Sequence, residues 1–199
     1  MERAAPADHS INQLIARRWS PRSFDSGRLV DRVALGSLFE AARWAPSFGN
    51  LQPWRFIVGI NFDEGHQAVL ETLAAGNQRW ASKAPVLFIA LARTVHLEDG
   101  KPHPHGVHDL GLALSNLFLQ AVDQGLSCHL MAGFSPEKVV EAFGVPQEYR
   151  PMTAGAVGYQ GNLEDLPEDL QKREVRPRER LPLDELVFSG VWNKPLGLD

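Results

Sequence analysis

The segment 109–124 constrains the fold most, because the helix that it is expected to form is apolar on nearly every side. A helix at a protein surface carries its apolar residues on one stripe, whereas a helix that is apolar all round is buried. Other elements must therefore surround this segment, and a chain of 199 residues is long enough to provide them. The apolar positions are Leu110, Leu112, Ala113, Leu114, Leu117, Phe118 and Leu119.

Composition excludes several classes of protein. Hydrophobic residues make up 44% of the chain and charged residues 22%, values typical of a folded domain rather than a disordered or fibrous protein. A net charge of −4 disfavours a general nucleic-acid binder, which carries an excess of positive charge. Any local cluster of positive charge therefore needs a local explanation.

The single cysteine and the lack of long apolar segments narrow the class further. Cys128 cannot form a disulfide within the chain or a multi-cysteine metal site, and its apolar surroundings predict an inert core residue. The first residues lack the apolar region of a signal peptide, and the apolar stretch 84–92 is half the length of a membrane span. A soluble cytoplasmic protein is expected.

The order of the expected elements favours an α+β fold with helices around a small sheet, because strands and helices do not alternate strictly. A capping-box pattern at Ser10 and Gln13 predicts the start of the first helix, and Pro21 limits its end. The expected helices cover residues 10–20, 31–45, 66–81, 109–124 and 136–143, with Asp31 and Ser135 as N-caps and Gly144 after the last of them. The expected strands are Trp54–Ile60, 85–92, Ser127–Met131 and 153–159. Residues 101–106 are expected to form a surface loop, and the polar segment 161–180 an arm or excursion of a single domain spanning 1–199.

The basic segment 17–24 is the first candidate site. If the chain is extended after Arg18, then Arg18, Ser20 and Arg22 share one face, because alternate residues of an extended chain point the same way. Two guanidinium groups and a hydroxyl suit a phosphate, which arginine binds in a bidentate manner. A solvated basic stretch, or arginine ion pairs at a helix end, would explain the same residues.

Two further segments have weaker individual signals. Asn50 and Gln52 offer uncharged donors and acceptors that suit the polar edge of a heterocycle, although a turn also explains them. Arg178 and Arg180 offer a second pair of guanidinium groups, although exposed charges in a mobile tail would look the same. The histidines of segment 103–108 are expected to belong to a stiff surface loop rather than to a zinc site.

Taken together, the motifs RRWSPRSF at 17–24, APSFGNLQPW at 45–54, the pairs Gly133-Phe134 and Gly158-Tyr159, and RERLPL at 178–183 resemble the FMN-dependent nitroreductase family. The resemblance covers residues 10–190. It implies an α+β fold with a small, mainly antiparallel central sheet surrounded by helices. It also implies an intertwined homodimer with one FMN at each of two subunit-interface sites.

The resemblance further implies a role for each matching residue. Arg18, Ser20 and Arg22, with Trp19 between them, look like contacts to the ribityl phosphate and the ring, and Arg178 and Arg180 like further phosphate contacts. Asn77 resembles a position near the pyrimidine edge, and the backbone of 131–133 a stretch near flavin N5. The loop residues that would reach the flavin from the partner subunit are Pro46, Ser47, Phe48, Asn50 and Gln52, and the 131–133 stretch is Met131, Ala132 and Gly133.

An NAD(P)H oxidoreductase is the function that this resemblance implies. No side chain accepts a hydride, so the cofactor carries the chemistry and no catalytic side chain or metal is expected. The implied cycle is ping-pong: hydride passes from NADH or NADPH to flavin N5, the donor product leaves, and a planar acceptor such as a nitroaromatic or a quinone enters. Three alternatives remain, namely a relative with another acceptor (enal reduction, dehalogenation, flavin breakdown), a non-catalytic flavin sensor or carrier, and a binding module for a different phosphate ligand.

Overall fold

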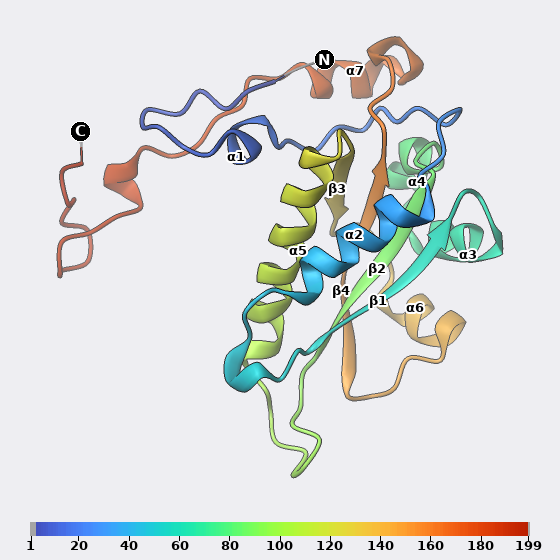
Figure 1. Ribbon diagram of the computed structural model, residues 1–199, viewed down its shortest axis with the longest axis horizontal. Helices are drawn as coiled ribbons and strands as arrows, with labels where there is room; N and C mark the ends of the chain where they lie inside the picture. Colours follow the sequence, from blue (N-terminus) through green and yellow to red (C-terminus); the bar gives the residue numbers. More distant parts are fainter. Residues whose placement is uncertain (1–2, 199) are drawn as a thin grey trace.

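The computed structural model describes residues 3–198, and its centre is a four-stranded antiparallel sheet. The strand order is β1-β2-β4-β3, so that β1 and β3 form the two edges (Figure 1). The mainly antiparallel α+β fold expected from the sequence is confirmed. The strands are β1 Trp54–Ile60, β2 Val86–Arg93, β3 Ser127–Met131 and β4 Tyr149–Gly158.

Helices cover both faces of this sheet because β2 is apolar on both sides. Alternate residues of a strand point to opposite faces. Phe88 and Ala90 accordingly pack with α2 (Arg32–Arg43) and α5 (His105–Asp123), whereas Leu87, Ile89 and Leu91 pack with α3 (Glu64–Thr72) and α6 (Pro136–Phe143). The remaining helices are α1 Gln13–Arg17, α4 Ala75–Ala81 and α7 Glu168–Glu174, and single 3₁₀ turns cover Phe48–Asn50, Leu163–Asp165 and Leu183–Glu185.

Local capping signals predicted several element ends. Asp31 caps α2 by accepting hydrogen bonds from the next N–H groups of the helix, and Ser135 caps α6 in the same way. Gly144 ends α6 in the left-handed conformation, with φ +59°, as glycine does at many helix C-termini. The strands Trp54–Ile60 and Ser127–Met131 have the expected bounds.

Tertiary contacts corrected other bounds. The first helix is capped by Asn12, whose side chain accepts the N–H of Leu14, and not by Ser10. The helix expected over 66–81 is two helices, because Leu73 is extended and forms a bridge with Phe134. The central helix begins at His105, and β4 begins at Tyr149, four residues before the expected start.

Two expectations about surface segments were also wrong in part. His103, in the expected surface loop, is 2% exposed. Segment 161–180 is not only an excursion, because Leu166 and Leu170 belong to the hydrophobic core beside α3 and α6. The chain leaves the body only after α7, and residues 183–198 extend beyond α1 with Trp192 80% exposed (Figure 1).

The central helix α5 is buried on one face and not all round. Leu110, Ala113 and Leu117 are buried against α2 and the sheet, whereas Leu112 and Phe118 are only partly covered. The outer apolar side of α5 is therefore incompletely covered within one chain. Among the described helices, none is both long and apolar enough to cross a membrane.

Candidate functional site

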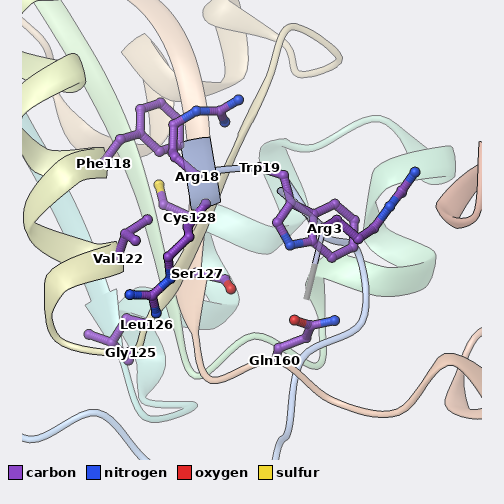
Figure 2. A pocket seen from close by; sticks show the side chains of 11 residues that line it. Arg3, Arg18, Trp19, Phe118, Val122, Gly125, Leu126, Ser127, Cys128 and Gln160 are labelled. Carbon is purple, nitrogen blue, oxygen red and sulfur yellow. The ribbon is translucent and has the colours of Figure 1, made fainter. Parts of the chain in front are cut away.

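The basic motif 17–24 lies beside the first residues of β3. Helix α1 ends at Arg17, and Arg18 continues in an extended conformation (φ −61°, ψ 122°). Its guanidinium group donates to Oγ of Ser20 at 3.3 Å and lies 5.6 Å from the ring centroid of Phe118. Figure 2 shows Arg18 alongside Phe118. Both residues line a cavity of about 320 Å³. The cavity is lined by Arg3, Arg17, Arg18, Trp19, Phe118, Val122, Gly125, Leu126, Ser127, Cys128 and Gln160.

Arg18, Arg178 and Arg180 lie close together in this region. Burial, and then the nearby Arg180, lower the pKa of Arg18. Burial, followed by Arg18, Arg180 and Arg3, lowers the pKa of Arg178. Within residues 3–198, no carboxylate forms an ion pair with Arg18, Arg178 or Arg180. Like charges that crowd together and keep no counter-ion make a site for an anion.

Groups of the protein itself hold Arg22 and Arg178. Nη1 of Arg22 lies 3.4 Å from Oε2 of Glu174, a carboxylate that is 3% exposed. The guanidinium of Arg178 donates to the carbonyl oxygens of Ala16 at 2.8 Å and Arg18 at 2.9 Å, and also to that of Arg3. The structure therefore brings Arg178 to the motif, but the guanidinium of Arg178 donates largely to backbone carbonyls.

Cys128 lies at the wall of this cavity and is a core residue, as expected. Its side chain is 2% exposed, and burial raises the pKa of the thiol. A thiol that stays protonated is a poor nucleophile. The cavity therefore offers positive charge and no activated nucleophile at this position.

His129, which follows Cys128 in β3, contacts the backbone of the motif. Its ring Nδ1 donates to the carbonyl oxygen of Pro21 at 2.8 Å, directly before Arg22. Burial lowers the pKa of His129 from 6.5 to about 4. The neutral imidazole is thus the form that the fold accommodates.

This pKa predicts that the protein loses stability as the pH falls below 6.5. Between pH 6.5 and pH 4 the unfolded chain binds a proton at His129 and the folded chain does not, so acid favours unfolding. Above pH 6.5 the imidazole of His129 is neutral in both the folded and the unfolded state, so its contribution to the free energy of unfolding is constant. We expect His129 to account for about 2 kcal/mol of the loss between pH 7 and pH 5. Urea unfolding at both pH values checks this: His129→Asn should show the smaller loss, and equal losses would contradict the assignment.

A second predicted group assembles at the other end of β3. Nδ2 of Asn77, on α4, donates to the carbonyl oxygen of Gly133 at 2.9 Å. A Cβ at position 133 would lie 2.8 Å from the same Nδ2, so a side chain there would displace the amide of Asn77. Thr153 donates to the carbonyl oxygen of Met131 at 3.1 Å and fixes the strand end. The expected neighbours Asn77 and 131–133 are therefore in contact.

Edge strand β3 connects these two groups. Arginines lie beside its first residues at Cys128, and the amide of Asn77 lies beyond its last residue, Met131. With a rise of about 3.3 Å per residue, the two groups are separated by roughly 15 Å. An elongated ligand with an anionic end and a polar ring edge fits such a row of groups.

The loop 46–52 lies far from this row within the chain. It joins β1 at Trp54, which aligns through Ala92 with Arg150 of β4, whereas Cys128 aligns with Val157. Seven residues along a strand correspond to about 23 Å, and the opposite sheet edges are about 14 Å apart. The structure therefore does not bring Pro46, Ser47, Phe48, Asn50 and Gln52 to the arginines of the same chain.

The loop has a defined shape of its own. Oγ of Ser47 accepts the N–H of Gln52 at 3.1 Å, and Asn50 and Gln52 both adopt positive φ. The N–H of Phe48 donates to the buried carboxylate of Asp109 at 3.0 Å. The half-exposed Phe48 ring stacks on His105, with centroids 4.7 Å apart. The loop is thus held with its Phe48 ring presented at the surface.

Sequence reasoning missed Glu174, His129 and Asp109. Each of them forms a hydrogen bond with a backbone group far away in the sequence. The carboxylate of Glu174, for example, accepts the N–H of Arg22. Glu174 stands in a polar, charged segment that looks like a solvated surface. Only its burial in the fold distinguishes it, so no local signal was present.

Comparison with known proteins identifies the family. The chain is 34% identical to a solved structure described as an oxidoreductase containing FMN, covering 94% of this chain and 96% of that one with a TM-score of 0.89. It is 36% identical over 150 residues to an uncharacterised 15.4 kDa protein of Mycolicibacterium smegmatis (71% of this chain, 99% of that protein). It is 28% identical over 193 residues to an NADH dehydrogenase of Thermus thermophilus (80% of this chain, 86% of that protein). The nitroreductase family model matches residues 15–64 and 60–159, and the chain belongs to the nitroreductase family.

Proposed function

We propose that the protein is an FMN-dependent oxidoreductase that passes a hydride from NADH or NADPH to a planar acceptor. The observation that carries the proposal is the row along β3, with Arg18 and Arg180 close together at one end and Asn77 with Gly133 at the other. FMN has a dianionic phosphate at one end and a heterocycle with polar edges at the other, so its chemistry matches the row. The similar oxidoreductase containing FMN supports the same assignment.

The residues present fit FMN group by group. Arg18, Ser20 and Arg180 would hold the phosphate, with Arg22 and Arg178 behind them. Trp19 lies in the same cavity wall, where a ribityl chain would pass. When bound, FMN supplies the hydride chemistry that no side chain can perform.

The chain's own groups then orient and shield the reacting ring. The backbone of 131–133 continues from the end of edge strand β3, and its main-chain groups would contact the ring. Asn77 is fixed by its hydrogen bond to Gly133 and would present its remaining amide group to the pyrimidine edge. We propose a ping-pong order, in which the oxidised nicotinamide leaves before the acceptor binds in the same place.

A homodimer completes the site in this proposal. The loop 46–52 cannot reach the arginines of its own chain, so the corresponding loop of a second copy would cover the flavin. The incompletely covered face of α5 and the extended segment 183–198, with Trp192 80% exposed, would be buried by that copy. A symmetric pair contains two such sites.

The visible spectrum tests the proposal directly. We expect the purified protein to be yellow, or to become yellow with added FMN, and to bleach under anaerobic NADH or NADPH. Colour should return on addition of a quinone or a nitroaromatic compound. The donor that bleaches faster identifies the preference between NADH and NADPH.

The other outcomes distinguish the alternatives. A yellow protein that neither donor bleaches would favour a flavin sensor or carrier. A colourless protein whose thermal midpoint rises with other nucleotides, but not with FMN, would favour a different phosphate ligand. A protein that bleaches but reoxidises only with an enal or a halogenated aromatic would retain the enzyme class and change the acceptor.

A further inference from the structure

We infer that Glu174 and Arg178 are positioning residues, which together form a brace that holds the cofactor-binding motif in place. The inference rests on the proposed FMN site and changes the role of Arg178, which the family resemblance makes a phosphate contact. Both residues lie in the segment that follows the last core strand, and this segment runs back past α1 (Figure 1). They hold the backbone of residues 16–23 from two sides.

Glu174 accepts hydrogen bonds from backbone N–H groups of the motif. One carboxylate oxygen accepts the N–H of Arg22 at 2.6 Å and that of Ser23 at 3.3 Å, and the other lies 3.4 Å from the guanidinium of Arg22. The carboxylate is 3% exposed, so water cannot replace these contacts. A buried charge persists only where it is paired and hydrogen-bonded, and here the partners all belong to the motif.

Arg178 donates hydrogen bonds to backbone carbonyl oxygens in and beside the motif. Its guanidinium donates to the carbonyl oxygens of Ala16, Arg18 and Arg3. The carbonyls in the last turn of a helix lack partners within the helix, and Ala16 belongs to the last turn of α1. Arg178 therefore caps α1 from a position 162 residues later and fixes the point where Arg18 leaves the helix.

Arg180 differs from Arg178 although it is two residues away. Its guanidinium donates to the carbonyl oxygen of the adjacent Glu179, at 2.7 Å, and its side chain lies at the surface near Arg18. It holds no distant backbone group among the described residues. Arg180 is thus available to an anion, whereas Arg178 is occupied by the protein, and the pair forms a matched comparison.

Lysine substitutions separate the two roles. Lysine keeps the positive charge and binds phosphate as a point charge, but it cannot reproduce a planar guanidinium that spans several carbonyls. We expect Arg178→Lys to lower the thermal midpoint of the flavin-free protein by about 4–8 °C and to weaken FMN binding at least about tenfold. Arg180→Lys, at a proposed phosphate contact, should leave the midpoint within about 1 °C and weaken FMN binding by less than about tenfold, because lysine keeps the charge but loses the bidentate contact.

Each other combination contradicts the brace. If Arg178→Lys behaves like Arg180→Lys, Arg178 is an ordinary phosphate contact. If Arg178→Lys lowers the midpoint but the folded protein, assayed well below it, binds FMN as wild type does, the role is structural only. Glu174→Ala removes the acceptor of the N–H groups of Arg22 and Ser23. Like Arg178→Lys, it should lower the thermal midpoint and weaken FMN binding. Wild-type protein that binds no FMN overturns the proposed function itself, whereas wild-type binding with unaffected variants overturns the brace alone.

Discussion

Replacing Arg18 and Arg22 together by alanine is expected to weaken FMN binding by several hundred-fold or more. The variant would lose the charge-assisted contact of Arg18 with the phosphate and the charged contact of Arg22 that holds the motif, each worth about 1.5–3 kcal/mol, and each 1.4 kcal/mol is tenfold in affinity. The loss of FMN affinity exceeds the sum of these two contacts, because the buried carboxylate of Glu174 then remains beside the phosphate site without its guanidinium partner. Fluorescence titration of the flavin-free protein with FMN measures the change.

Riboflavin and a distant arginine provide the controls for this double variant. Riboflavin lacks the phosphate, so its weaker binding should change far less than that of FMN. Arg43→Ala removes an exposed arginine on α2 that pairs with Glu40, and it should leave FMN binding unchanged. An FMN affinity of the double variant within about threefold of wild type would refute the location of the phosphate site.

The second large effect is restoration of activity in a mixed dimer. We expect a chain with Arg18→Ala and Arg22→Ala, and a chain with Asn50→Ala and Gln52→Ala, each to be inactive alone. The loop variant loses two amides at positions of positive φ, which asparagine tolerates better than alanine does. In the heterodimer, one of the two sites combines the intact arginines of one chain with the intact loop of the other. Co-expression with two different tags and tandem purification should give about half of the wild-type activity.

The mixed dimer distinguishes shared sites from sites within one chain. If arginines and loop served the same chain, each chain of the heterodimer would carry one defect and activity would stay absent. A protein that scatters light as a monomer while retaining FMN would contradict the shared site as well. The roughly 23 Å and 14 Å separations along and across the sheet keep the loop away from the arginines of its own chain, which is why we expect the mixed dimer to regain activity.

Local patterns predicted much of the fold, and the reasons are visible in particular elements. The strand Trp54–Ile60 is bounded by a proline-containing loop, and α6 carries its own cap at Ser135 and its own stop at Gly144. These signals act over a few residues. The break at Leu73 depends instead on Phe134, more than sixty positions away, and no local pattern marks it.

The candidate site divides in the same way. The cation motif, the amide-rich loop and Asn77 stand in recognisable sequence contexts, and their assignment to FMN remains a prediction. Glu174 and His129 act on the backbone of the motif, and their partners depend on the completed fold. The side chains that face a ligand can therefore be proposed from sequence, whereas those that hold them need the structure.

The contacts of Glu174 and Arg178 also link cofactor loading to the order of synthesis. Residues 16–23 leave the ribosome first, and the side chains that hold them follow 152 and 162 positions later. At about 5–20 residues per second, the motif waits roughly 8–30 s without those contacts. During that interval its arginines are present but not yet arranged, so a nascent chain offers cellular phosphates no finished site. We therefore expect the chain to bind flavin late, after the segment around α7 has folded.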